Sequence, residues 1–346
     1  MGKNIVVFSD GTGQDGGKGN NTNVYKLFNM VEDRTDRQIA FYDRGLGTGW
    51  RGLVGRATGM GISQNICDCY QFIFENYQAG DQIYLFGFSR GATTVRSLSG
   101  MIHLFGILPK SRPELIRKAY KIYKTRDSVK REAKAKHFID RHHTMWTSIK
   151  FLGVWDTVAA LGVPIKSISV ALDKLPFFRH KFHDLLLSPS VLNAYHALAV
   201  DDERKTFHPM IWTGRSEKTE VMEQVWFPGM HSDVGGGYEK HELSDIALKW
   251  MIERAERHDL LIYRRDRIPS TLNFDGFMHN SREGFPGTLY RQALRTWDTT
   301  TLGQPIIHQS VKYRSQNVNN QPVPTYQPWI CELEHKIEGL DQTENS

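Results

Sequence analysis

The 346-residue sequence has few cysteines and no long apolar run. Its cysteines, Cys67, Cys69 and Cys331, are too few for a disulfide framework, and no CxxC pair indicates zinc, so we expect a reducing compartment. No stretch of about 18 apolar residues is present, which excludes a transmembrane helix. The start, MGKNIVVFSDG, has too short an apolar run for a secretory signal. We therefore expect a protein that is cytoplasmic as synthesised, with secretion by a specialised system as the alternative.

What the sequence does contain is the composition of a folded protein. Apolar residues make up 40% and aromatic residues 11%, which is more than a disordered chain carries. Repeats, low-complexity tracts and long Pro-rich or Ser-rich linkers are absent. We predict a single domain over residues 1–340.

The excess positive charge lies in one part of the chain. The net charge is +6, and residues 110–148 hold twelve Lys or Arg against four Asp or Glu, whereas the remainder holds 32 against 34. This basic segment (residues 110–148) is predicted to be an insertion, either a cap over the active site, a contact with an anionic membrane surface or a solvated helical surface. Neither zinc-finger spacings nor an RNP-like aromatic strand is present, so no nucleic acid is expected as a partner.

Short apolar runs alternate with helical periods along the chain, which is typical of α/β architecture. The pattern predicts strands at 4–8, 38–42, 81–86, 149–155 and 223–227, and helices at 62–77, 92–101 and, capped by Ser244, 245–257. After Gly303 the pattern weakens. The predicted fold is α/β-hydrolase-like: a mostly parallel sheet flanked by helices, with a basic helical insertion.

The pentapeptide GFSRG, residues 87–91, is the strongest local signal for catalysis. A Gly-x-Ser-x-Gly sequence between a strand and a helix is typical of the nucleophile elbow of α/β-hydrolases. Gly87 and Gly91 leave no Cβ to clash where the strand meets the helix, and the serine takes a strained backbone conformation. We predict Ser89 as the nucleophile; an accidental turn is the alternative.

A serine nucleophile needs a base, and the base needs a carboxylate that fixes its tautomer. Asp156 ends the apolar strand FLGVWD at the same sheet edge as Ser89, although it could instead cap the following turn. His231 lies in the glycine-rich segment FPGMHSDVGGGY directly after a strand, where a triad histidine belongs. His308, in IIHQS, is the rival base. We predict Ser89, Asp156 and His231 as the catalytic triad.

An oxyanion hole takes two backbone N–H groups. The first is predicted at Arg90, which follows the nucleophile, and the second at Gly11 or Thr12 in the loop SDGTG after the first strand.

Two aspartates near these groups have alternative roles. Asp10 opens a turn resembling those of haloacid-dehalogenase-type phosphatases and actin-like ATPases, but the dehalogenase nucleophile would fall at Phe8, and neither family explains GFSRG. Asp233, two residues after His231, could support its loop or bind a cation. We assign both aspartates to support of the site.

Six sequence blocks occur in an order that resembles a known family: FSDGTG, GFSRGA, GVWDTV, AYHALAVDDERKTFHPMIW, PGMHSDVGGGY and SDIALKWMIERA. They span roughly residues 3–257, with IIHQSV as a weaker trailing match. Together they resemble the uncharacterised α/β-hydrolase domain family that includes one class of type VI secretion phospholipase effectors. The resemblance implies an α/β-hydrolase fold, lipid or other ester substrates, and Ser89, Asp156 and His231 as nucleophile, acid and base.

The sequence therefore predicts a serine ester hydrolase of the lipase, phospholipase or esterase type, acting through an acyl-enzyme and needing no cofactor or metal. Its expected partner is a small-molecule or lipid ester. Two alternatives stay open. One is a non-catalytic binding or scaffold module on a hydrolase fold. The other is a phosphate-binding enzyme that uses the Asp10-Gly11-Thr12 loop.

Overall fold

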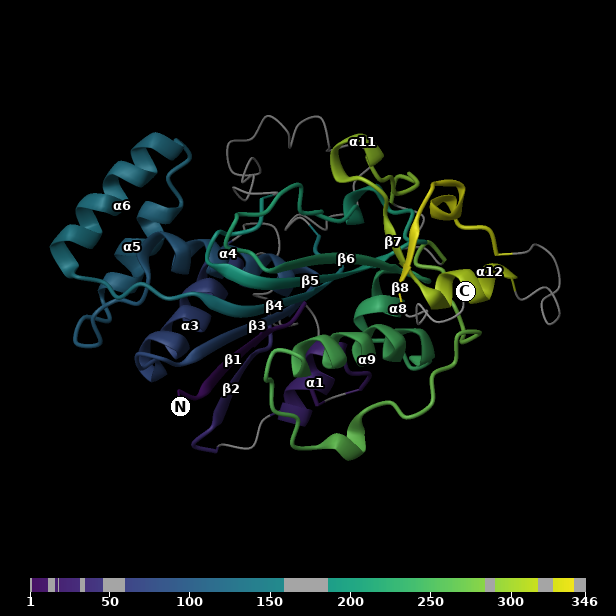
Figure 1. Ribbon diagram of the computed structural model, residues 1–346, viewed down its shortest axis with the longest axis horizontal. Helices are drawn as coiled ribbons and strands as arrows, with labels where there is room; N and C mark the ends of the chain where they lie inside the picture. Colours follow the sequence, from purple (N-terminus) through teal and green to yellow (C-terminus); the bar gives the residue numbers. More distant parts are fainter. Residues whose placement is uncertain are drawn as a thin grey trace.

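Eight strands form one sheet in which every neighbouring pair is parallel (Figure 1). The structure, a computed structural model, describes residues 2–11, 16–17, 19–31, 35–45, 60–158, 186–283, 290–316 and 326–338. The strands are β1 (Asn4–Ser9), β2 (Gln38–Asp43), β3 (Gln82–Phe88), β4 (Ile149–Trp155), β5 (Val191–Ala199), β6 (Val221–Phe227), β7 (Ile306–His308) and β8 (Lys336–Glu338). Their order is β2-β1-β3-β4-β5-β6-β7-β8. The α/β fold class predicted from the sequence is confirmed.

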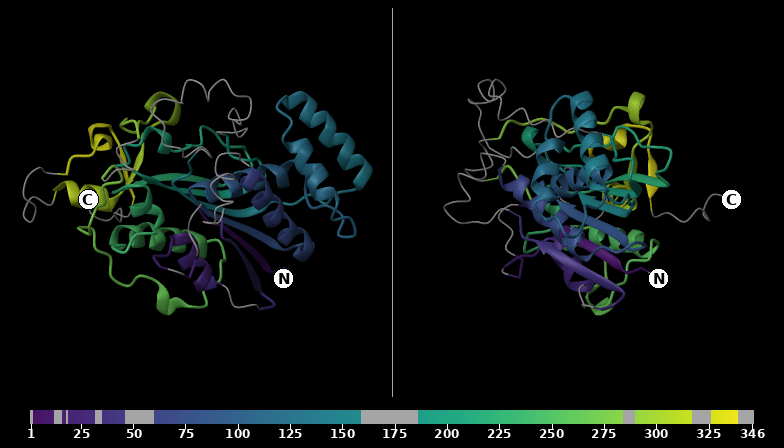
Figure 2. Two further views of the ribbon diagram at one scale, coloured as in Figure 1. Left: turned by 180° about the vertical axis from the view of Figure 1, so that it is seen from behind. Right: turned by 90° about the vertical axis from the view of Figure 1, so that its left-hand side faces the viewer.

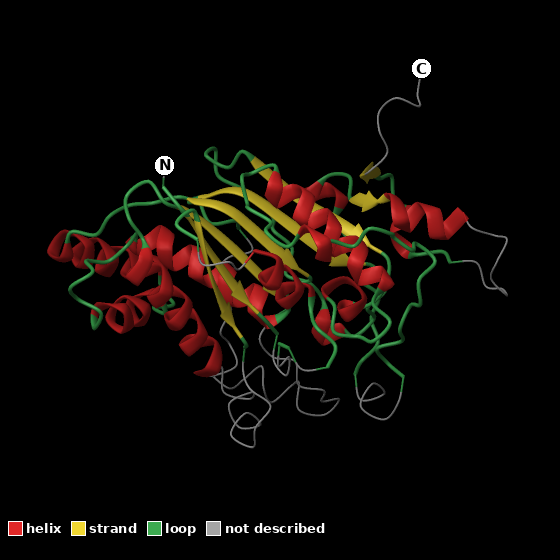
Figure 3. Cartoon of the chain, turned by 90° about the horizontal axis from the view of Figure 1, so that it is seen from below, coloured by secondary structure: helices red, strands yellow, loops and turns green. Residues whose placement is uncertain are grey.

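Helices cover both faces of this sheet (Figures 1 and 3). Residues of α3 and α4 pack on one face and residues of α1 and α9 on the other, so the sheet separates two apolar cores. Strands buried on both faces are continuously apolar, as in the NIVVFS of β1. The α-helices are α1 (Asn23–Val31), α3 (Met60–Asn76), α4 (Arg90–Phe105), α5 (Leu115–Tyr123), α6 (Ser128–His142), α8 (His231–Gly235), α9 (Glu242–Glu256), α11 (Thr299–Leu302) and α12 (Gln309–Gln316).

The strand order reverses at β1, and this reversal positions the site. β1 lies between β2 and β3, and the chain passes α1 on one face before β2 and α3 on the other face before β3. Ligands of parallel α/β sheets bind where the strand order changes direction, outside the carboxyl ends of the strands. Ser9 at the end of β1 pairs with Gly87 of β3, so the segments after both strands emerge side by side.

The structure differs from the sequence-based prediction in two places. The central strand β5, which contains His196, was not among the predicted strands. Because β5 is covered on both faces, its residues VLNAYHALA lack the polar alternation that marks a strand. Helix α9 begins at Glu242, before the predicted start. Ser244 therefore lies inside the first turn instead of capping the helix, and its hydroxyl donates to the carbonyl of His241.

The basic segment is helical, as predicted. It contains α5 and α6, and α6 begins after Asp127, whose carboxylate accepts the Lys130 N–H as an N-cap. Leu115 and Ile116 of α5 are buried, and the two helices pack on α3 and α4. Figure 2 shows this pair at the end of the molecule opposite β7 and β8. None of the described helices is long and apolar enough to cross a bilayer.

Candidate active site

Ser89 lies at the sharp turn between β3 and α4. Its backbone has φ 57° and ψ −121°, a conformation that costs a non-glycine residue free energy and is typical of functional sites. The N–H of Ser89 donates to the carbonyl of Trp155, at the end of β4, over 3.1 Å. The side chain is mostly buried, and the first turn of α4 starts directly behind it.

Two glycines allow the backbones around this turn to approach closely. A Cβ on Gly87 would lie 2.6 Å from the carbonyl oxygen of Gly91. A Cβ on Gly91 would lie 2.0 Å from the carbonyl oxygen of Ser9, in β1. Both distances are far below van der Waals contact, so any other residue at either position would push β1, β3 and α4 apart.

Asp156 and His231 form a buried hydrogen-bonded pair. Asp156 follows β4, and His231 is the first residue of α8, which follows β6. The Nδ1 of His231 lies 2.6 Å from Oδ2 of Asp156. The imidazole lies between two aromatic rings, with ring centroids 4.5 Å from Phe88 and 5.1 Å from Phe207. Because Phe88 directly precedes Ser89, the imidazole lies beside the turn that carries the serine.

The Nε2 of His231 is a polar atom of the site that lacks a hydrogen-bond partner among the described residues. It is buried, and no hydrogen bond joins it to Ser89 Oγ here. The bond to Asp156 assigns the proton to Nδ1, which leaves Nε2 with its lone pair. Hydrogen bonds of this kind are often long before a substrate binds. The arrangement can therefore accept a proton from a group placed at Nε2.

Arg295, which the sequence reasoning missed, is bound to the same aspartate. Its Nη1 lies 2.6 Å from Oδ1 and its Nη2 2.8 Å from Oδ2 of Asp156, a bidentate pair with both residues fully buried. The guanidinium also donates to the carbonyls of Ala199, Asp202 and Phe207. No local sequence motif predicts the contact between Arg295 and Asp156, because Arg295 lies outside the helices and strands and 139 residues from Asp156.

Burial and the neighbouring charges shift the pKa values of Asp156 and His231. Burial acts to raise the pKa of Asp156, but the charge and hydrogen bonds of Arg295, joined by those of His231, outweigh it and hold the pKa well below its usual range. Burial lowers the pKa of His231, and the nearby Asp156 carboxylate opposes this without reversing it. At neutral pH the site therefore holds a neutral imidazole beside an ionised and paired carboxylate.

The loop after β1 lies against the serine. A Cβ on Gly11 would be 3.3 Å from Ser89 Cβ and 3.8 Å from its Oγ. The N–H of Gly11 donates to Oδ1 of Asp10 over 2.7 Å, and the hydroxyls of Thr22 and Tyr42 donate to Oδ2. Asp10 thus ties this loop to α1 and β2, and burial raises its pKa to about 6.

The remaining predicted residues separate into three cases. Asp233 accepts the N–H groups of Met230 and His279 and contacts the His279 ring at 2.6 Å, which fixes the start of α8. His308, the rival base, contacts Ser310 instead of Asp156. Arg90 is the first residue of α4, and Thr12 lies outside the described residues. Among the described residues, no cluster of His, Cys, Asp and Glu could hold a metal ion.

Comparison with known proteins identifies similar sequences. Residues 3–254 match the sequence model of the family described as T6SS, phospholipase effector Tle1-like, catalytic domain. An uncharacterised protein of Saccharomyces cerevisiae is 30% identical over 237 residues, which cover 61% of this chain and 33% of that protein. The chain thus spans about a third of the length of this curated relative.

Two solved structures are distantly similar. An uncharacterised protein from Pseudomonas aeruginosa is 18% identical with a TM-score of 0.43, over 76% of this chain and 47% of that one. The Tle1 effector bound to the VgrG spike of the type 6 secretion system is 21% identical with a TM-score of 0.37, over 69% of this chain and 52% of that one.

Proposed function

This chain belongs to the family of Tle1-like phospholipase effector catalytic domains, and from that premise we propose that it is a serine hydrolase that cleaves carboxylic esters of lipids through an acyl-enzyme. The observation that carries the proposal is the buried Asp156–His231 pair beside the strained turn at Ser89. The three side chains come from the carboxyl ends of β3, β4 and β6, far apart in the sequence. That convergence supports a catalytic triad over a chance GFSRG match.

In the first half-reaction His231 acts as general base. Its Nε2 takes the hydroxyl proton of Ser89 while Oγ attacks the ester carbonyl carbon, giving a tetrahedral oxyanion. Collapse of that intermediate breaks the ester C–O bond, and the imidazolium returns the proton to the departing alcohol. In the second half-reaction water attacks the acyl-enzyme by the same route, which releases the acid and restores the Ser89 hydroxyl.

Donors for the oxyanion come from backbone on both sides of the serine. The N–H of Arg90 opens α4, where the helix dipole favours negative charge. The second donor is assigned to the loop that includes Gly11 and Thr12. In the free enzyme the N–H of Gly11 is bound by Asp10, so Asp10 sets the orientation of this loop beside Ser89.

Arg295 acts as a positioning residue in this mechanism. By binding both oxygens of Asp156 it fixes the carboxylate and keeps it ionised, and Asp156 in turn fixes the tautomer of His231. Burial, together with the positive charge of Arg204, lowers the pKa of His231. The base therefore stays neutral, and active, at mildly acidic pH.

Labelling with a fluorophosphonate, read by intact mass, tests this function. We expect one adduct on the wild type, none on Ser89→Ala and a much slower reaction on His231→Ala, because the probe reacts only with an activated serine. Ser315→Ala, which removes a hydroxyl from α12 away from the site, is the matched control and should label like the wild type. A folded wild type without adduct would contradict the proposal and favour the non-catalytic binding module.

A further inference from the structure

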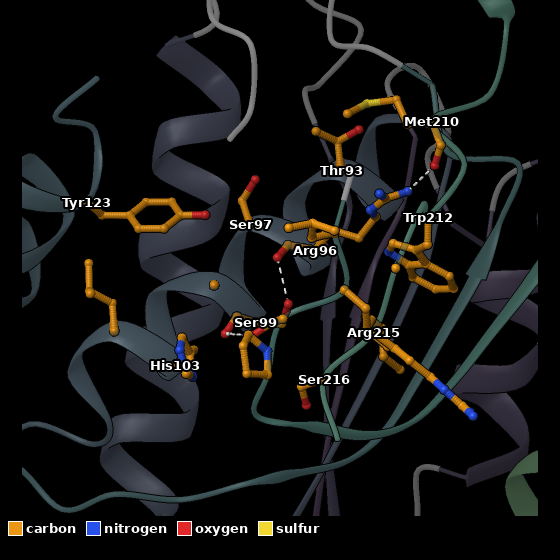
Figure 4. Close-up of a pocket in the computed structure, with 18 of the residues that line it drawn as sticks. Thr93, Arg96, Ser97, Ser99, His103, Tyr123, Met210, Trp212, Arg215 and Ser216 are labelled. Atoms are coloured by element: carbon orange, nitrogen blue, oxygen red, sulfur yellow. Dashed lines mark hydrogen bonds between the residues drawn. The ribbon is translucent and has the colours of Figure 1, made fainter. Parts of the chain in front are cut away.

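A cavity of about 540 Å³ lies along α4, the helix that follows Ser89 (Figure 4). The helix lines it with one face, through Thr93, Arg96, Gly100 and His103 at spacings of three and four residues. Thr93 lies one turn after Ser89, and Thr157, which also lines the cavity, directly follows Asp156. The cavity therefore extends along the nucleophile helix from residues that lie close in sequence to Ser89 and Asp156, although neither of these two lines it.

The lining of this cavity is amphiphilic and mainly cationic. Leu152, Leu187 and Trp212 contribute apolar surface, whereas the charged side chains are three arginines and one glutamate. Burial lowers the pKa of His103, so this histidine adds no positive charge at neutral pH. Such a lining fits a molecule with both a hydrocarbon part and an anionic group.

Arg96 is the charged group set deepest among these residues. Its guanidinium lies 4.9 Å from the centre of the Trp212 ring and donates through Nη1 to the carbonyl of Met210. Its Nη2 is shielded from solvent and has no hydrogen-bond partner in the described part of the chain. Burial alone lowers the pKa of Arg96 to about 9, with no carboxylate of the described residues acting to raise it.

Comparison with a fully buried arginine, Arg295, shows what is missing at Arg96. Arg295 is bound to both oxygens of Asp156 and to three carbonyls, which compensates its charge and its donors. A buried cation without such a partner is costly, so its retention beside a cavity indicates a ligand that supplies the missing negative charge.

We propose that this cavity is the binding site for the anionic group of the substrate, a carboxylate or phosphate oxyanion held by the guanidinium of Arg96 while the hydrocarbon part contacts Leu152, Leu187 and Trp212. This inference rests on the proposed function, since it places the ester at Ser89. Seven residues of α4 separate Ser89 from Arg96, which corresponds to about 10 Å along the helix. The preferred substrate is thus an anionic amphiphile whose charge and ester lie about that far apart.

A matched pair of esters tests the proposal: para-nitrophenyl octanoate and the para-nitrophenyl monoester of octanedioic acid, which differ only in a terminal carboxylate. The wild type should prefer the anionic ester, and Arg96→Gln should lower kcat/KM for it by about 10-fold to 100-fold, as expected for a charge-assisted hydrogen bond, with little change for the neutral one. Arg96→Lys should retain part of the preference. Lys336→Gln, which removes one exposed charge from β8, controls for net charge and should leave the preference unchanged.

Binding of inorganic phosphate to Ser89→Ala protein, measured by calorimetry, supplies a readout without turnover. Phosphate that binds, requires Arg96 and competes with the anionic ester in the wild type supports the proposal. Phosphate that binds without competing would identify a separate effector site and overturn it. Equal loss on both esters in Arg96→Gln, or no loss on either, would also overturn it. If the wild type hydrolyses neither ester the proposed function fails, and Arg96-dependent phosphate binding alone then decides whether the anion site stands.

Discussion

At the scale of single residues, the main feature of the candidate active site is that Asp156 is bound by two other side chains. Asp156 faces the guanidinium of Arg295 with both oxygens and the imidazole of His231 with one of them. In the catalytic triad of serine proteases the aspartate fixes the tautomer of the imidazole and stabilises the imidazolium. Here burial of the imidazole outweighs the effect of the carboxylate, so the pKa of His231 stays below its ordinary value.

This balance predicts the pH dependence of the reaction. Because the pKa of His231 is lowered and the neutral imidazole is the base, kcat/KM should stay on its plateau at neutral pH and fall only below the ordinary histidine value of about 6.5. The measurement is kcat/KM for a neutral ester across about pH 4–8. Asp10→Asn is the control, since burial raises the pKa of Asp10 to about 6 and its titration would also change kcat/KM in this pH range. A limb above about 6.5 in both proteins would contradict the assignment.

Arg295 should also matter for stability. Arg295→Met leaves a buried carboxylate unpaired, so we expect the free energy of unfolding at neutral pH to fall by about 3–5 kcal/mol. The folded-state pKa of Asp156 is depressed, so the stability that the ion pair provides is present above the unfolded-state value and is lost as pH falls through the folded value.

Urea unfolding at pH 7 and at about pH 3 measures this effect, because the unfolded carboxylate titrates near 4. The difference in unfolding free energy between the wild type and Arg295→Met should be smaller at the lower pH, because protonation neutralises the Asp156 carboxylate in the variant. Arg295→Lys, which retains the charge, should lose less stability. A loss of equal size at both pH values would indicate packing alone.

At the scale of elements, the sequence predicted β2 and the four strands that are followed by site residues, and it missed β5, β7 and β8. β1, β3, β4 and β6 each combine an apolar run with a polar or glycine-rich turn, and these turns carry Asp10, Ser89, Asp156 and His231. β5 lacks polar alternation because it is buried on both faces, and β7 and β8 are each only three residues long. Hydrophobic periodicity therefore does not identify a strand in either case.

The candidate site divides in the same way. Ser89, Asp156 and His231 were found because each follows a strand, and parallel strands bring their carboxyl ends to one edge. Arg295 was missed because it lies in irregular backbone, where no period fixes the position of a side chain. Arg96 was passed over because a single arginine in a helix is ordinarily a solvated residue. Its burial depends on Trp212 and Met210, which are distant in sequence.

At the scale of the whole molecule, charge is distributed unevenly. The basic segment carries the positive excess, and the α5–α6 pair occupies one end of the molecule, with β7 and β8 at the other (Figure 2). Trp146 is 60% exposed at the end of this segment. A positive end with an exposed aromatic side chain fits attraction to an anionic lipid surface.

We predict binding to vesicles that contain phosphatidylserine, weakening as salt rises from about 0.05 to 0.3 M, because exposed charges are screened. Lys134→Gln on α6 should weaken binding by about 1 kcal/mol, roughly fivefold. Lys336→Gln, at the opposite end, is the matched control and should leave binding unchanged. Vesicle binding that does not depend on salt concentration, or equal effects of both substitutions, would indicate that the basic segment is a solvated surface and not a membrane contact.

The distance in sequence between Asp156 and Arg295 has a consequence for synthesis. A ribosome adds about 5–20 residues per second, so the 139 residues between them take on the order of ten seconds to make. During that interval the nascent chain already carries Ser89, Asp156 and later His231, but the carboxylate lacks its cation. The buried ion pair of Asp156 is therefore completed only after Arg295 has been synthesised.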